Sequence, residues 1–231
     1  MTGGPRAASL LRVAVLASGR GSNLQALIDA RDSGQLRIEL AGVFSDRDAA
    51  FALERARAAG IPARALSPDR FEKRAAFDAA LFALVDDVQP HLIVCAGYMR
   101  LISSAAVRRH LGRMINIHPS LLPRYTGLDT HARALAAGDA EHGASVHFVT
   151  PALDAGPVIS QVRVPVLADD SAESLSRRVL AREHALLVQS VGLFAAGRID
   201  LVDERARFDR VPLAMPLQLD IDDQLHAEVA A

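Results

Sequence analysis

Short apolar runs alternate with amphipathic segments over the first half of the chain, and this alternation limits the possible folds more than any other feature. The run at 12–17 is apolar and rich in valine, which predicts a strand buried on both faces. A glycine-containing turn follows it and leads into a helix that Gly34 ends. Strands alternating with helices predict an α/β fold: an open, mostly parallel sheet with helices on both faces. Ligands bind such sheets outside the carboxyl ends of the strands.

The same pattern predicts the remaining elements as far as residue 196. Further strands are expected at 38–44, 63–66, 91–96, 114–117, 145–150 and 158–166. Further helices are expected at 49–59, from about 69 to 88, at 104–110 and at 171–196. The link at 151–157 is too short for a crossover helix, so the last two strands are expected to pair antiparallel in the C-terminal half.

The chain is expected to form a single domain spanning 1–231, with a change of character near residue 110. Its parts are a first half at about 12–110, a second half at about 111–199 and a peripheral tail at 200–231. The acidic end of that tail, 220–231, is expected to be frayed.

Composition excludes several classes of protein. The 26 basic and 27 acidic residues give a net charge of -1, so a general nucleic-acid-coating role does not follow. An apolar run approaching the ~20 residues of a membrane span is absent from the sequence, and we expect a cytoplasmic protein without a membrane partner. Cys95 is the single cysteine, which excludes an internal disulfide. Lys73, the single lysine, lies in an expected helical charged run and is a poor Schiff-base candidate.

The turn at 19–23 carries the first candidate binding site. Glycines at a strand-to-helix turn let backbone N–H groups approach an anion, and Ser22 and Asn23 add donors. The alternative is a tight turn with Ser22 or Asn23 as the N-cap. A dinucleotide fingerprint is not matched, because Leu24 occupies the third glycine position and we find no acidic residue at the end of the second strand. The turn therefore favours one small phosphate.

A second candidate site lies at 116–123. Alternation places Asn116 and His118 on one face of a strand, with His118 at its carboxyl end. An amide and an imidazole side by side can stabilise an oxygen on which negative charge develops. Asp154, on a loop with glycine and proline, can orient that imidazole and favour its protonated form. The alternatives are a histidine that caps a strand end and an Asx-turn at Asp154.

Other chemistry is less well supported. His142 and His147 are expected on opposite faces of a strand and do not form a ligand pair. Metal-ligand spacing and an HExxH motif are both absent, so we expect no metal. GxSxG is absent and Cys95 lies in an apolar strand, which disfavours a covalent nucleophile. The remaining set suits direct transfer of a group between two bound substrates.

These residues resemble the phosphoribosylglycinamide formyltransferase family from about residue 12 to 199. The matching strings are ASGRGSNLQ at 17–25, AGYMR at 96–100, NIHPSLLP at 116–123, HGASVHFVT at 142–150 and DAGPVI at 154–159. The NIHPSLLP string and the later Asp-x-Gly are shared by folate formyltransferases and hydrolases of this type. The Gly-Ser-Asn turn is the part specific to enzymes that act on glycinamide ribonucleotide.

The resemblance implies a Rossmann-like formyltransferase fold and a formyl group passing from 10-formyltetrahydrofolate to the amine of glycinamide ribonucleotide, in purine biosynthesis. It implies that Asn116, His118 and Asp154 are catalytic. It places the ribonucleotide phosphate on Gly21, Ser22 and Asn23 and the ribose on Glu183. It places the folate on Arg74, Met99, Arg100, Leu101, Ile102, Asn116, Thr150, Pro151, Ala152 and Leu153. A homodimer is compatible with the sequence, which leaves the oligomeric state open.

Two departures and three rival functions accompany the resemblance. Family members often carry Pro-Gly-x-His where this chain has 126–129, and often a polar residue at the position of Leu180. One rival is a formyltetrahydrofolate hydrolase, for which a regulatory domain would be expected ahead of the first strand. Another is a methionyl-tRNA formyltransferase, for which a C-terminal RNA-binding domain would be expected. The third is a non-catalytic folate or nucleotide carrier.

Overall fold

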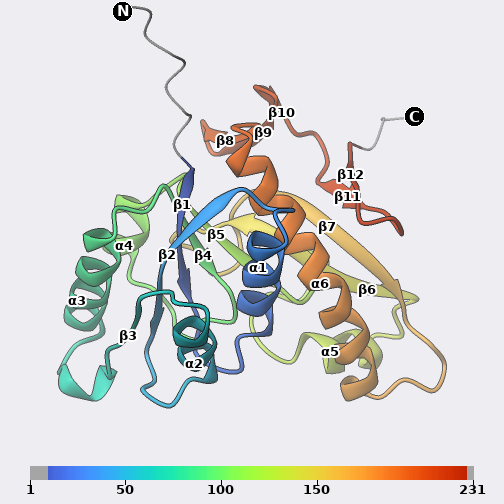
Figure 1. The fold of residues 1–231 in the computed structure, drawn as a ribbon. Coiled ribbons are helices and arrows are strands. Elements are labelled where there is room, and N and C mark those ends of the chain that lie inside the picture. The colour runs from blue at the N-terminus through green and yellow to red at the C-terminus, as the bar shows by residue number, and fades with distance from the viewer. Residues whose placement is uncertain (1–9, 228–231) are drawn as a thin grey trace, which may run out of the picture.

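A computed structural model describes residues 10–227, and within them one large mixed sheet carries helices on both faces (Figure 1). Its strand order is β12-β11-β7-β6-β5-β4-β1-β2-β3. The strands are β1 (Leu11–Leu16), β2 (Ile38–Ser45), β3 (Ala63–Ala65), β4 (Leu92–Cys95), β5 (Met114–His118), β6 (Glu141–Phe148), β7 (Val158–Pro165), β8 (Ile199–Val202), β9 (Arg205–Phe208), β10 (Val211–Pro212), β11 (Leu217–Leu219) and β12 (Leu225–His226). The helices are α1 (Ser22–Asp32), α2 (Phe51–Ala58), a 3₁₀ turn η1 (Pro68–Arg70), α3 (Arg74–Asp87), α4 (Ser104–Arg109), α5 (Thr130–Ala136) and α6 (Ala172–Ala195).

The parallel half of the sheet, β1 to β5, has the expected α/β architecture. Val13 and Val15 of β1 face a core completed by α1, α2 and α6, whereas Ala14 and Leu16 face a second core completed by α3 and α4. Because β1 is buried on both faces, its sequence is an apolar run rather than an alternation of apolar and polar residues. The parallel pairing brings the carboxyl ends of β1, β2, β4 and β5 to one edge.

The antiparallel half begins where β5 pairs with β6, and β6 in turn pairs antiparallel with β7. The short 151–157 link therefore acts as predicted. Strand β6 begins at Glu141, four residues before the expected start at Ser145. Helix α6 also begins where predicted, because the Ser171 hydroxyl accepts from the Ser174 N–H in a capping box.

The expected start of the long helix near Asp69 is wrong. Ser67 accepts from the Asp69 N–H and caps the short turn η1, which is not continued. Lys73 has φ -130° and ψ 137°, so it is extended and lies before α3, not inside a helical charged run. Phe71 is also extended, and its ring packs edge-on against Phe77 at 5.8 Å between centroids. Burial of Phe71 against α3 accounts for the break between the turn and the helix.

The tail is ordered over its described part, so the expectation that it is frayed is wrong for 220–227. Strands β8, β9 and β10 form a separate antiparallel sheet, and β11 adds to the edge of β7 with β12 beside it. The Asp220 carboxylate accepts from the N–H groups of Asp222 and Gln224, and Arg182 of α6 donates to Asp223 at 2.6 Å. These contacts hold the segment in a turn beside α6. Residues 228–231 lie outside the described part.

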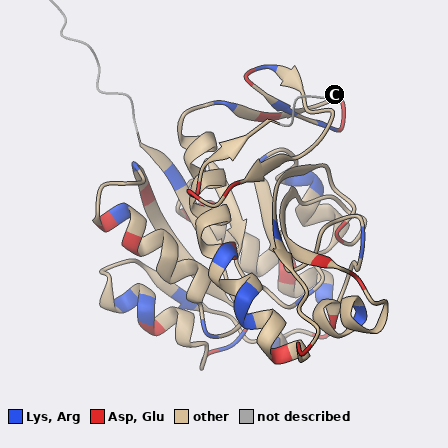
Figure 2. Ribbon diagram, turned by 90° about the vertical axis from the view of Figure 1, so that its right-hand side faces the viewer, with Lys and Arg blue, Asp and Glu red and all other residues tan. Residues whose placement is uncertain are grey.

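Basic and acidic residues are interspersed along the helices and loops of the ribbon in Figure 2, in keeping with the near-zero net charge.

Candidate active site

The glycine turn at the end of β1 forms a backbone site. Gly21 is the N-cap of α1 in the left-handed region, with φ 69°, and no side chain caps this helix. A Cβ atom at Gly21 would lie 2.7 Å from the Cβ of Ala52, so glycine is required for space as well as for conformation. Ser22 and Asn23 are the first helical residues, which makes the alternative of either one as N-cap wrong. The free N–H groups at this helix start suit an anion.

Asn23 connects that turn to α6. Its Nδ2 donates to the Glu183 carboxylate at 3.0 Å, and both side chains are buried. Burial raises the pKa of Glu183, and the hydrogen bond from Asn23 opposes that shift. The Asn23 Oδ1 atom is buried without a hydrogen-bond partner among residues 10–227. The structure thus brings together Asn23 and Glu183, which are 160 positions apart, as the expected ribonucleotide site requires.

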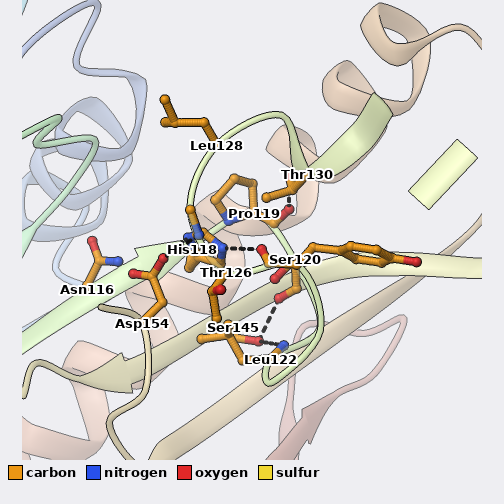
Figure 3. Close-up of polar contacts among 12 residues, drawn as sticks. Asn116, His118, Pro119, Ser120, Leu122, Thr126, Leu128, Thr130, Ser145 and Asp154 are labelled. Carbon is orange, nitrogen blue, oxygen red and sulfur yellow. Dashed lines mark hydrogen bonds and ion pairs between the residues drawn. The ribbon is translucent and has the colours of Figure 1, made fainter. Parts of the chain in front are cut away.

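Asn116, His118 and Asp154 converge at the carboxyl end of β5, where the Asp154 carboxylate lies between the other two in Figure 3. The Nδ1 atom of His118 is 3.5 Å from Asp154 Oδ2. The Nε2 atom is 2.9 Å from the carbonyl oxygen of Tyr125, to which only an N–H can donate. Both ring nitrogens therefore face acceptors, and a doubly protonated imidazolium satisfies both.

The segment after Tyr125 also holds Asp154. The N–H of Gly127 donates to Asp154 Oδ2 at 2.9 Å. Asp154 and Tyr125 both have positive φ, at 48° and 55°, which is uncommon for residues other than glycine. Backbone strain of this kind needs surrounding contacts to maintain it. Here it directs one carbonyl group and one carboxylate at the same imidazole ring.

Buried hydroxyl groups brace the turn that follows His118 (Figure 3). Ser145 donates to the carbonyl of Ser120 at 2.7 Å and accepts from the N–H of Leu122 at 3.1 Å. Thr130 donates to the carbonyl of Pro119 at 2.6 Å. These bonds satisfy backbone groups of an irregular buried turn and so fix the position of His118.

His147 belongs to the site although the sequence pattern gave it no role. It lies opposite Asn116 in the β5–β6 register, with its Nε2 3.1 Å from the Asn116 Nδ2 and 3.8 Å from Asp154 Oδ1. Burial lowers the pKa of His147 to about 4. His142 contacts His131 at 3.1 Å, whereas His147 contacts Asn116, so the two histidines have different surroundings. Knowledge of the strand pairing would have found His147, because residues paired across strands share a face.

A cavity of about 230 Å³ adjoins these side chains. Its lining includes the predicted folate residues Arg74, Arg100, Leu101, Ile102, Asn116, Thr150, Pro151, Ala152 and Leu153, together with Asp154 and His147. Met99 does not line it, and its side chain is 59% exposed. The Arg100 Nε atom is buried without a partner among the described residues. A larger groove of about 920 Å³ shares the 150–152 segment but contains none of the three catalytic candidates.

The expected absence of an acidic residue after the second strand is wrong. Strand β2 extends to Ser45, one residue beyond the predicted end, and Asp46 follows it directly. Asp46 is buried, and one of its carboxylate oxygens has no partner among residues 10–227. Burial raises the pKa of Tyr98, and the negative charge of Asp46 adds to that shift. The glycine pattern still departs from a dinucleotide fingerprint at Leu24, which is buried in the core.

The two departures from the family pattern lie in different surroundings. In the 126–129 segment, Leu128 is 68% exposed and Asp129 is the left-handed N-cap of α5. Arg133 holds this segment by donating to the carbonyl of Thr126 at 2.6 Å. Leu180 lies on α6 and is half-buried.

Two further findings apply to the described residues alone. Over 10–227, no group of three or more His, Cys, Asp or Glu side chains is placed to hold a metal ion. In the same range, no helix is both long enough and apolar enough to cross a membrane.

Comparison with known proteins gives consistent results. The Formyl transferase family model matches residues 11–191. The chain is 47% identical to the phosphoribosylglycinamide formyltransferase of Escherichia coli over 199 residues, which cover 86% of this chain and 94% of that protein. The structure of the Coxiella burnetii phosphoribosylglycinamide formyltransferase superposes with a TM-score of 0.86 at 48% identity, covering 89% of this chain and 97% of that one. A formyltetrahydrofolate deformylase from Pseudomonas syringae has a TM-score of 0.81 at 28% identity, covering 87% and 66%.

Proposed function

The chain belongs to the formyl transferase family. We propose that it transfers the formyl group of 10-formyltetrahydrofolate to the amine of glycinamide ribonucleotide in purine biosynthesis by the mechanism below. The hydrolase alternative has less support, because the deformylase is the more distant relative at 28% identity against 47% and 48%. The Gly21 turn favours an acceptor that carries a phosphate.

The observation that carries the mechanism is the convergence of Asn116, His118 and Asp154 beside the cavity. The folate supplies a formyl carbon, which the substrate amine attacks. The Asn116 amide N–H and the His118 Nδ1–H donate to the formyl oxygen as it gains negative charge. The Nε2–H of His118 stays bonded to the Tyr125 carbonyl, so proton transfer at this ring occurs at Nδ1.

Asp154 is placed to transfer the proton that must pass from the attacking amine to the departing folate nitrogen. A carbon–nitrogen bond forms to the amine and the bond between the formyl carbon and the folate nitrogen breaks. The amine must lose one proton, and the departing nitrogen must gain one. Asp154 can accept the first and deliver it to the second, because its carboxylate is held by the Gly127 N–H and stands beside His118. Its charge also stabilises the imidazolium.

The cavity lining fits a folate. Arg74 and Arg100 supply positive charge for the carboxylates of its tail, and Leu101, Ile102 and Val149 supply apolar surface for its ring. The Arg100 Nε atom has no partner among the described residues, and the residue lines the cavity. At the turn, Gly21, Ser22 and Asn23 hold the phosphate, and Glu183 holds the ribose hydroxyls. Met99 lies outside the cavity lining and contacts folate at most from its rim.

One assay tests the function. The protein is mixed with 10-formyltetrahydrofolate in the presence and absence of glycinamide ribonucleotide, and loss of the formyl-folate absorbance is followed. Transfer predicts turnover only with the ribonucleotide present, and unchanged turnover after exhaustive chelation. Equal turnover in its absence would identify a hydrolase, and no turnover in either mixture would identify a carrier. The cytoplasmic location and the homodimer stay predictions.

A further inference from the structure

His147 is placed to control the amide of Asn116. It is 2% exposed and lies across the β5–β6 ladder from Asn116, with 3.1 Å between its Nε2 and the amide Nδ2. Its Nδ1 is 2.9 Å from the carbonyl oxygen of Phe148. The mechanism above uses neither ring nitrogen of His147, although the ring lines the same cavity.

The hydrogen bonds of this ring determine its tautomer. A carbonyl oxygen only accepts, so the Nδ1 atom beside Phe148 carries the proton. In a neutral imidazole the Nε2 atom then has a lone pair and only accepts. The amide of Asn116 must consequently present its NH₂ group to His147, and this conclusion does not depend on how the amide oxygen and nitrogen are assigned.

The surroundings keep the ring neutral near pH 7. Burial lowers the pKa of His147 to about 4, and the charge of His118 acts in the same direction. The opposing groups are Asp154, whose Oδ1 is 3.8 Å from Nε2, and the Phe148 carbonyl. The His118 ring is 6.5 Å away between centroids and perpendicular to it.

We propose that His147 is a positioning residue that orients the Asn116 amide, so that one N–H is held by His147 and the other is directed to the formyl oxygen. This rests on the proposed function, since it takes Asn116 as a donor in the reaction. With the amide reversed, its oxygen would face the developing negative charge and repel it. A preorganised donor would be replaced by an acceptor, which removes the stabilisation that such donors provide.

A double-mutant cycle tests the proposal, with kcat measured for His147→Phe, Asn116→Ala and the double variant. We expect Asn116→Ala to lower kcat about 100-fold, the scale of a lost oxyanion donor. We expect His147→Phe to lower kcat roughly 10-fold or more with little change in the KM of the ribonucleotide. In the Asn116→Ala background, His147→Phe should lower kcat by less than about 3-fold, because its effect on kcat passes through Asn116.

His142→Phe is the matched control, since His142 lies on the same strand but contacts His131 instead, at 3.1 Å. Its effect should be the same with and without Asn116. If His147→Phe does not fold, as a melting curve would show, His147→Leu, which also lacks an acceptor, replaces it in the cycle with the same expectation of coupling. Equal fold-losses from the His147 change in both backgrounds would overturn the proposal while leaving the proposed function intact. A normal kcat in Asn116→Ala would instead overturn the role of Asn116, and with it this inference.

Discussion

The two halves of the sheet build their parts of the site in different ways. In the parallel half, the turn at Gly21 offers backbone N–H groups at a helix start, and the residues involved are neighbours in sequence. In the antiparallel half, the site consists of side chains from β5, β6 and the link after β6, which meet only because the strands pair. A backbone site depends on local conformation, whereas a side-chain site depends on long-range register. The two should therefore respond differently to substitution.

The largest effect is expected in the antiparallel half, from His118→Ala. In the proposed mechanism, loss of the imidazole removes a donor to the formyl oxygen and the partner of the Asp154 carboxylate, so kcat should fall by at least about 100-fold. Binding of glycinamide ribonucleotide should survive, because the turn proposed to hold its phosphate lies between β1 and α1, away from His118 in the sequence. Steady-state kinetics together with calorimetric titration of the ribonucleotide measures both. A near-normal kcat would contradict the assignment.

Asp154→Asn should have the next largest effect. The substitution keeps size and one acceptor oxygen for the Gly127 N–H but removes the charge 3.5 Å from His118 Nδ1. The group proposed to carry the proton from the amine to the folate nitrogen is then lost, and we expect kcat to fall by about 10- to 100-fold with the melting temperature little changed. Steady-state kinetics together with a melting curve measures both. A normal kcat with a lower melting temperature would instead make Asp154 a turn-forming residue.

Gly21→Ala should affect the parallel half by a different route. An alanine here has strained φ and its Cβ meets Ala52 at 2.7 Å, so the turn must shift. We expect the KM of the ribonucleotide to rise roughly 10-fold with a smaller change in kcat, and stability to fall by about 1–3 kcal/mol. Gly34→Ala is the matched control, with a similar φ of 78° but open space around it. An equal rise in KM in both variants would refute a specific role for the turn.

The smallest effect concerns the pH dependence of stability. The pKa of His147 is lowered to about 4 in the folded protein, against 6.5 as the ordinary value. Between these pH values the unfolded chain binds more protons, so stability is lost as the pH falls from 6.5 toward 4. At pH 5 the loss from this histidine is about 2 kcal/mol.

Urea unfolding at pH 7.5 and pH 5 should therefore show a smaller acid loss in His147→Gln than in the unsubstituted protein. His142, whose pKa is also lowered to about 4, remains in both proteins and contributes equally. The same acid loss in both proteins would contradict the shift assigned to His147.

Local features of the fold could be predicted because they follow from short-range interactions. The apolar run of β1, the helix end at Gly34 and the start of α6 near Ser171 each depend on residues within a few positions. The start of α3 could not be predicted in the same way. The segment from Asp69 to Lys73 has a sequence that could form a helix. In the structure Ser67 caps a separate turn and the Phe71 ring packs against Phe77, so a packing contact decides where the helix begins.

Residue type and near spacing were enough to predict the alternation of elements, the Gly21 turn and the candidates Asn116, His118 and Asp154. The folded chain was needed to show that His147 meets Asn116, that Tyr125 and Gly127 hold His118 and Asp154, and that β11 covers the edge of β7. The physical reason is that strand register, buried hydrogen bonds and backbone strain are satisfied by partners far away in the sequence, and a local pattern does not specify which partner is chosen.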